Sequence, residues 1–158
     1  MTEDLSFTAD LDQSLRHCFS VLAEAAHARK VPMHTPSIAT LGGDGRPRTR
    51  IVVLRDFDAA SRTLRFHTDR RSEKFNELSA DPRCAMLFYD AAQKIQIRLE
   101  GEASLHHADE IADEAWAHSQ AMSRHCYATN PAPGSQLATA DAFHVPKGRE
   151  LSDEGKPH

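Results

Sequence analysis

The sequence has no long apolar run and little that would cross-link it covalently. No stretch approaches the roughly 18 apolar residues of a membrane helix. The start, Met1 to Asp4, lacks the basic residues of a secretory signal. The three cysteines are far apart and form no CxxC pair, so neither disulfides nor a cysteine zinc site is indicated. We therefore expect a cytoplasmic protein with no membrane partner.

An excess of positive charge and the usual metal motifs are also missing. The formal net charge is −4, so no general field would attract nucleic acid, and we expect none as a partner. The ten histidines include no HExxH or Cys/His spacing, which indicates no metal site. A chain of 158 residues suits one domain, which we expect over residues 1–145, followed by a charged, mobile tail over 146–158.

Short segments rich in β-branched residues, separated by turn residues, predict a sheet. The predicted strands are Ser37–Leu41, Arg50–Arg55, Leu64–Thr68, Cys84–Tyr89 and Lys94–Gly101. Gly42 to Gly45 suits a hairpin turn before the Arg50 strand, and we expect that strand to pair with Leu64–Thr68. The last strand alternates, with an apolar face of Ile95, Ile97 and Leu99 and a polar face of Gln96, Arg98 and Glu100.

Helical spacing appears near both ends of the chain. Asp10 precedes an amphipathic segment that ends near Arg29–Lys30. Its apolar face is predicted to comprise Leu11, Leu15, Cys18 and Leu22. A second helix is expected from about Ala108 to Ser123, followed by a loop over Tyr127–Gln136. Five or six strands with two or three helices predict a mainly β, α+β fold, a small antiparallel barrel with flanking helices.

Asp69 to Leu78 reads as a short helix that begins directly after a strand. Free N–H groups at a helix start favour a phosphate or another dianion. The hydroxyls of Thr68 and Ser72 and three basic side chains, Arg70, Arg71 and Lys74, lie close in sequence. The alternative is a capped, solvated surface helix, since basic residues near a helix start are ordinary on surfaces.

These segments resemble, in order and spacing, the flavin-binding signature of the pyridoxamine 5'-phosphate oxidase-like split-barrel family. The matching stretches are Arg50–Arg55, Phe66–Asp69 with Ser72 and Lys74, and Gln96–Gly101. The resemblance implies a split barrel that binds FMN. In the family, residues matching Arg50, Thr68, Ser72 and Lys74 hold FMN, mostly at its phosphate.

The resemblance also places the flavin ring. It implies that the backbone of Ile51 to Leu54 lies along the isoalloxazine, that Gln96 hydrogen-bonds the flavin, and that charge near the ring comes from Arg55 with Gln96 and Arg98. The cofactor-binding positions are then Arg50, Ile51, Val52, Val53, Leu54, Arg55, His67, Thr68, Ser72, Lys74 and Gln96. No catalytic residue is identified.

The sequence departs from the family at three places. Ser72-Glu73-Lys74 replaces an S-R-K sequence, so one basic phosphate contact is lost or supplied by Arg70 or Arg71. The family's tyrosine, arginine and serine for the vitamin phosphate fall on Trp116, Gln120 and Arg124. The C-terminal W-R-x-x-R strand is missing.

The resemblance therefore implies an FMN-dependent oxidoreductase acting on a small molecule other than the vitamin phosphate. It also implies a homodimer with FMN at the subunit boundary, which a loop containing Ser135 and Gln136 would reach from the partner. Two alternatives stay open. One is a flavin-binding or haem-binding module without turnover, and the other is a deazaflavin-dependent reductase.

Overall fold

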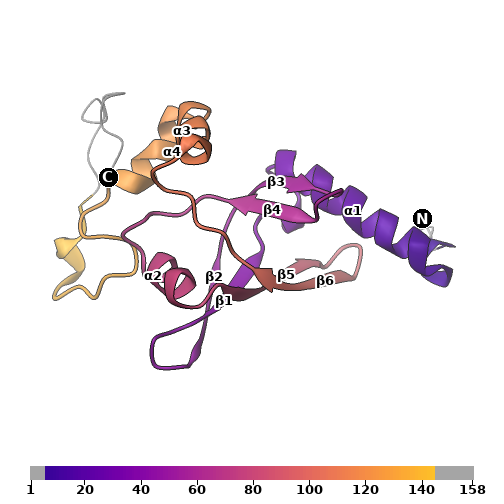
Figure 1. Ribbon diagram of the computed structural model, residues 1–158, viewed down its shortest axis with the longest axis horizontal. Coiled ribbons are helices and arrows are strands. Elements are labelled where there is room, and N and C mark those ends of the chain that lie inside the picture. The colour runs from indigo at the N-terminus through magenta and orange to yellow at the C-terminus, as the bar shows by residue number, and fades with distance from the viewer. Residues whose placement is uncertain (1–5, 145–158) are drawn as a thin grey trace. The chain divides into compact units, whose positions relative to one another are not determined.

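A computed structural model describes residues 6–144 of the chain (Figure 1). These residues gather into two compact units. The first comprises the residues up to His67 together with Arg83–Glu102, and the second comprises Thr68–Pro82 and the residues from Ala103 onward. The expectation of a single domain over residues 1–145 stays a prediction. The predicted tail, residues 146–158, lies outside the described residues.

The first unit contains all six strands that the described residues form. Its elements are η1 (Ser6–Ala9), α1 (Leu11–His27), η2 (Pro32–His34), β1 (Ser37–Leu41), β2 (Pro47–Ile51), β3 (Leu54–Asp58), β4 (Thr63–Phe66), β5 (Arg83–Asp90) and β6 (Ile95–Glu102). The second unit is built from helices and loops. Its elements are α2 (Glu73–Ala80), α3 (Glu110–Ala117), α4 (Ala121–Arg124), η3 (His125–Ala128) and η4 (Ala140–Ala142).

The strands form two antiparallel sheets, one with the order β2-β1-β5-β6 and one of β3 with β4. The β1–β2 hairpin turns through the glycine-rich segment, where the N–H of Gly42 donates to the carbonyl of Arg46 at 2.9 Å and Gly45 has φ 74°. A positive φ suits glycine, which has no Cβ. The predicted hairpin turn is confirmed. The predicted pairing of Arg50–Arg55 with Leu64–Thr68 is right only at its end, because Leu54 pairs with Phe66 while Arg50 and Ile51 pair with β1.

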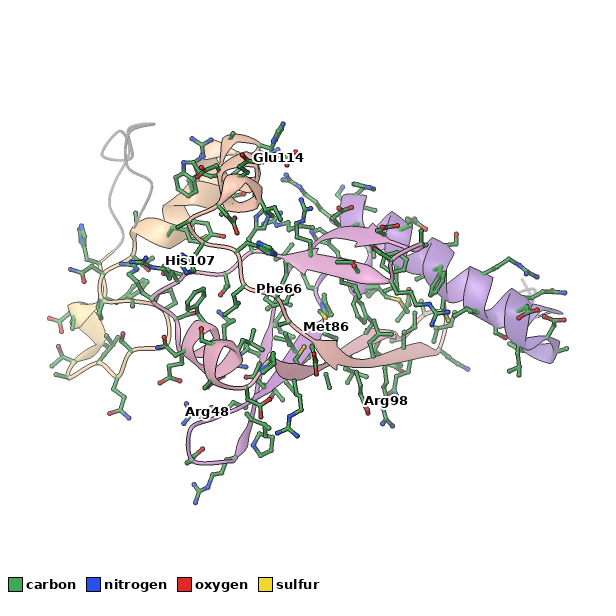
Figure 2. The ribbon with its side chains drawn as sticks, viewed as in Figure 1. Arg48, Phe66, Met86, Arg98, His107 and Glu114 are labelled. Atoms are coloured by element: carbon green, nitrogen blue, oxygen red, sulfur yellow. The ribbon has the colours of Figure 1, made fainter. Side chains whose placement is uncertain are left out.

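The core of the first unit lies between α1 and the sheets. Its buried members are Leu22, Ala25, Ala26, Met33, Ile38, Val52, Leu54, Met86, Phe88 and Ile97. The C-terminal half of α1 contacts β3 (Figure 1). Phe66 and Met86, both labelled in Figure 2, bring β4 and β5 into the same cluster. Burial of this kind stabilises a fold by about 25 cal/mol for each Å² of apolar surface.

The predicted apolar face of α1 is only partly right. Leu22 is 1% exposed, but Leu11 is 89% exposed and Leu15 is 44% exposed. The helix begins as predicted, because the Asp10 side chain accepts a hydrogen bond from the Gln13 N–H at 2.8 Å. It ends at His27, before the predicted Arg29–Lys30. Apolar spacing predicted the helix. It did not predict which part of its apolar face is covered by the rest of the unit.

The predicted strand Arg50–Arg55 is wrong as one continuous strand. β2 ends at Ile51, and β3 begins at Leu54 in the other sheet. Between them the Val52 N–H donates to the carbonyl of Pro36 at 2.9 Å, outside the strand pairs of either sheet. The chain therefore changes sheets within an apolar run, where neither composition nor alternation marks the break.

Both predicted helices of the second unit are shorter than expected. α2 begins at Glu73 rather than near Asp69, so it does not follow β4 directly, and its N-cap is Ser72. The predicted helix over 108–123 ends first at Ala117, where the N–H of His118 bonds back to the Glu114 carbonyl. A short α4 follows after a break. The predicted loop over Tyr127–Gln136 is broadly confirmed, apart from the 3-10 turn η3 at its start.

Candidate functional site

A lysine and two hydroxyls converge at the start of α2. The ammonium nitrogen of Lys74 donates to the Thr68 hydroxyl at 3.0 Å and to the Ser72 hydroxyl at 3.4 Å. The two hydroxyl oxygens are 3.2 Å apart. We call Thr68, Ser72 and Lys74 the Lys74 cluster. The structure therefore brings together three of the residues that the sequence assigned to a phosphate.

Local backbone structure explains why these side chains meet. The Ser72 hydroxyl donates to the Asp69 carbonyl at 2.7 Å, and the Ser72 N–H donates to the same oxygen at 3.0 Å. This turn brings Thr68 back beside the first residues of α2. The Ser72 side chain makes no cap hydrogen bond to the helix. The first N–H groups of α2 lie beside the cluster, and such groups favour an anion.

Asp69 and Arg71 form a fork beside the Lys74 cluster. Asp69 Oδ1 accepts from the Arg71 N–H at 2.8 Å and from Nε at 3.0 Å, while Oδ2 accepts from Nη2 at 2.6 Å. The same guanidinium donates to the carbonyls of Thr129 and Tyr127, at 3.1 and 2.7 Å. Its hydrogen bond to Asp69 raises the pKa of Arg71. Arg71 is thus engaged within its own chain, and Arg70 is the exposed basic neighbour.

Arg50 lies on β2 in the first unit and is half-buried. Its guanidinium donates to the hydroxyl of Thr40, a residue 2% exposed on β1, and to the Arg48 carbonyl at 3.2 Å. One neighbour on β1 and one on β2 itself therefore orient this side chain. Residues 51–54 follow it, with Ile51 65% exposed and with Val52 and Leu54 buried. The Val52 N–H is used by Pro36, so only the remaining backbone of this segment can meet a ligand.

His67 follows β4, which ends at Phe66, whereas the predicted strand ran to Thr68. Burial lowers the pKa of His67, and the charges of Arg55 and Arg65 lower it further. The ring is therefore held toward its neutral form. Arg55 lies on β3, and its Nε is buried with no hydrogen-bond partner among the described residues.

Gln96 and Arg98 lie on the exposed face of β6, and Ile97 between them is buried, as the alternation predicted. In Figure 2 the Arg98 side chain extends away from β6. Strand register places Leu87 opposite Arg98 and Tyr89 opposite Gln96. This face therefore combines exposed polar groups with two exposed apolar side chains.

Two of the residues that stand at the family's substrate positions, Trp116 and Arg124, contact each other in the second unit. The Arg124 guanidinium lies 5.0 Å from the centre of the Trp116 ring and donates to the Trp116 carbonyl at 2.9 Å. Trp116 also meets Tyr127 edge to face, with ring centres 5.9 Å apart. Gln120 is exposed after α3, and Ser135 and Gln136 are exposed in the following loop. Arg124 thus closes the end of α3, a role that sequence alone did not suggest.

Several partners of the site were not predicted from the sequence. They are Thr40 beside Arg50, and Asp69 with the carbonyls of Tyr127 and Thr129 around Arg71. The spacing Asp-x-Arg is a weak signal for the fork, but backbone carbonyls more than fifty residues away leave no sequence signal.

The described residues were also expected to lack two other kinds of feature, a membrane-spanning helix and a metal site. No helix in that part of the chain is both long and apolar enough to cross a bilayer. No group of three or more His, Cys, Asp or Glu side chains within the same residues is placed to hold a metal ion. The three cysteines are free thiols, and burial raises the pKa of Cys18 and of Cys84.

Comparison with known proteins places this α+β fold in a class of flavin-binding domains. The family described as "Pyridoxamine 5'-phosphate oxidase, FMN-binding domain" matches residues 15–107, more than half of the chain. The chain belongs to this family.

Curated relatives carry the corresponding enzyme name. A pyridoxine/pyridoxamine 5'-phosphate oxidase of Bordetella petrii is 33% identical over 123 residues, which cover 77% of this chain and 54% of that protein. One from Myxococcus xanthus is 38% identical over 108 residues, 67% of this chain and 49% of that protein. The chain thus spans about half the length of these relatives.

Solved structures share the fold. A pyridoxamine 5'-phosphate oxidase-related, FMN-binding protein from Nostoc punctiforme has a TM-score of 0.64 at 24% identity, with 77% of this chain and 66% of that chain covered. PhzG from Burkholderia lata, solved with tetrahydrophenazine-1-carboxylic acid, has a TM-score of 0.65 at 23% identity, with 82% and 62% covered. The predicted α+β split barrel with flanking helices is confirmed.

Proposed function

We propose that this protein is an FMN-dependent oxidoreductase, and that the Lys74 cluster binds the FMN phosphate. The observation that carries the proposal is the convergence of one ammonium and two hydroxyls within 3.4 Å of one another at the start of a helix. Ammonium and hydroxyl groups are among the groups that phosphate oxygens accept from, and a helix start favours an anion. The residues present therefore suit this part of the cofactor.

The remaining cofactor positions follow from membership of the family. Arg50 is assigned to the phosphate as well, and the ring is assigned to the backbone of residues 51–54 with Gln96. Bound FMN would accept and return electrons, so the protein's part is to bind it, orient it and adjust the charge around it. Arg55 with Gln96 and Arg98 are the groups that we assign to this adjustment.

The substrate is a small molecule that differs from the vitamin phosphate. Gln120 stands where the family places an arginine, and an amide offers neither the charge nor the two-pronged geometry of a guanidinium. Arg124 does not replace that arginine in the described contacts, because its guanidinium donates to carbonyls of Trp116 and Ala117. The oxidase names of the relatives therefore suggest a reaction type but not a substrate.

The missing substrate arginine also supports a second candidate, a protein that binds flavin but catalyses no reaction with it. In this second candidate the Lys74 cluster still binds the flavin phosphate, but no residues remain that bind a substrate. Anaerobic photoreduction of the bound flavin, followed by mixing with a panel of electron acceptors, separates the two candidates. Reoxidation by at least one acceptor at a rate well above that of free flavin supports the oxidoreductase.

We also propose a cytoplasmic homodimer with FMN at the subunit boundary. Ser37 on β1 pairs with Ile51 on β2 and with Leu87 on β5, so these side chains share one face of the sheet. Tyr89 lies two residues after Leu87 on β5 and is on the same face. These three apolar side chains are 65%, 43% and 55% exposed. Exposed apolar groups gathered on one sheet face favour a covering partner. A second copy of the chain is the simplest cover, since closed dimers are the commonest soluble assembly.

Purification from a flavin-replete host tests the cofactor assignment. We expect yellow protein that releases FMN on heating or acidification, with the mass of the released compound identifying it. Release of a deazaflavin would replace FMN by that cofactor. Colourless protein that also fails to take up added FMN would refute the proposal.

A further inference from the structure

We propose that Arg71 is a positioning residue for the flavin phosphate, which it serves without touching it. This inference rests on the proposed function, because it concerns the same Lys74 cluster. Arg71 lies between Thr68 and Lys74 in sequence, and as a cation beside a phosphate site it would ordinarily be assigned to the phosphate. The contacts of its guanidinium indicate a different role.

The guanidinium is committed to a buried carboxylate. The Asp69 side chain is 7% exposed, and it receives the backbone N–H, Nε and Nη2 of Arg71, with the closest approach at 2.6 Å. Planar, two-pronged contact of this kind is specific to arginine. Moving Arg71 onto a phosphate would leave a buried carboxylate without its cation, which is costly.

The same guanidinium also fixes a distant segment of the second unit. It donates to the carbonyls of Tyr127 and Thr129, and Thr129 is 8% exposed. The next residue, Asn130, exchanges two backbone hydrogen bonds with His144, at 2.9 and 2.7 Å. Arg71 therefore holds the base of the loop that these two residues close.

The fork is joined to the Lys74 cluster through Asp69. While its carboxylate holds Arg71, its carbonyl accepts both the N–H and the hydroxyl of Ser72. Ser72 in turn lies within 3.4 Å of Lys74 and 3.2 Å of Thr68. The turn from Thr68 to Ser72 therefore positions the hydroxyls of the Lys74 cluster. Through Arg71 it also holds the base of the 130–144 loop. A phosphate that orders the cluster should also steady this loop.

Two substitutions separate positioning from direct contact. Arg71→Lys keeps the charge but loses the fork, so a positioning role predicts that FMN affinity falls about tenfold while riboflavin affinity stays within about twofold. A direct contact predicts that lysine largely preserves FMN affinity. For Asp69→Asn the two hypotheses predict opposite changes in FMN affinity. A positioning role predicts weaker FMN binding, whereas direct contact predicts tighter binding because a nearby negative charge is removed.

Arg46→Lys is the matched control. Arg46 follows Asp44 at the same spacing, and its N–H donates to Asp44 Oδ1 at 3.1 Å, but its side chain is 85% exposed and lies 4.0 Å from the carboxylate. We expect no change in either affinity for this variant. Amide hydrogen exchange supplies a second readout, since Arg71→Lys should accelerate exchange at Asn130 and His144 and Arg46→Lys should not.

The proposal is overturned if Arg71→Lys keeps the FMN affinity of the parent protein, if Asp69→Asn binds FMN more tightly, or if Arg71→Lys loses both flavins equally. Failure of the proposed function has a different signature. In that case the parent protein itself shows no preference for FMN over riboflavin, and exchange at Asn130 and His144 still decides whether Arg71 holds the loop.

Discussion

The ammonium nitrogen of Lys74 lies 3.0 Å from the hydroxyl oxygen of Thr68, six residues earlier in the chain. This contact spans the turn between β4 and α2 and brings a cation to a helix start. A lysine side chain loses considerable rotamer freedom when it is held in place. We propose that this ordering serves the flavin phosphate.

The residues at the family's substrate positions predict poor activity on the phosphorylated vitamin. We expect turnover of pyridoxamine or pyridoxine 5'-phosphate to be absent or very slow, because Gln120 supplies no cation for the substrate phosphate. Formation of pyridoxal 5'-phosphate by the FMN-loaded protein, followed by absorbance, measures this. Robust turnover of either compound would show that Gln120 is not the position that meets the phosphate.

Assembly should depend on the flavin. A ligand that binds only the assembled form favours assembly by mass action, so FMN should shift the dimerisation equilibrium toward the dimer. Sedimentation of apo and FMN-loaded protein over a range of concentrations measures the shift. A monomer that holds FMN tightly at every concentration would contradict the shared site.

A charge placed on the proposed interface should oppose that assembly. Leu87→Lys introduces a cation on the exposed face of β5 and should weaken the dimer at least tenfold, since burial of an unpaired charge is costly. Leu15→Lys is the control, because Leu15 is similarly exposed, at 44% against 43% for Leu87, but lies on α1 rather than on the sheet. Equal dimerisation of the two variants would place the interface elsewhere.

Acid should destabilise the apo protein partly through His67. Because its pKa is lowered in the folded state, the unfolded chain binds this proton more readily. The stability linked to His67 is present above the ordinary histidine pKa of about 6.5, and it is lost as the pH falls from there toward the lower folded value. We expect the melting temperature of His67→Gln to fall less steeply between about pH 7 and pH 5 than that of the parent protein. Identical slopes would show that the folded state does not disfavour the charged ring.

The elements of this fold that could be predicted from sequence are those with local causes. Alternation in β6 assigned Ile97 to the core and Gln96 to the exposed face, and Asp10 marked the start of α1. The change of sheet at Val52 could not be predicted, because its N–H bonds to Pro36, and that bond depends on how the chain folds back.

The same distinction applies to the candidate site. The Lys74 cluster lies within seven residues, so its members were predicted together, and local structure brought them together. The role of Arg71 could not be predicted, since its partners Tyr127 and Thr129 lie 56 and 58 residues away. Composition near a helix start indicates that a cation is present but not which acceptors it meets.

The measurement that tests the central claim most directly compares the two flavins on one variant. Lys74→Met removes the ammonium while keeping a long side chain, and Lys30→Met, at an exposed position after α1, is the control. Charge-assisted hydrogen bonds are worth roughly 1.5–3 kcal/mol, so Lys74→Met should weaken FMN binding by about 10- to 100-fold. Arg50→Ala should act in the same direction. Titration of each variant with FMN and with riboflavin, followed by quenching of flavin fluorescence, should show loss for FMN and little change for riboflavin. Equal losses for the two flavins on Lys74→Met would contradict the assignment of the Lys74 cluster to the phosphate.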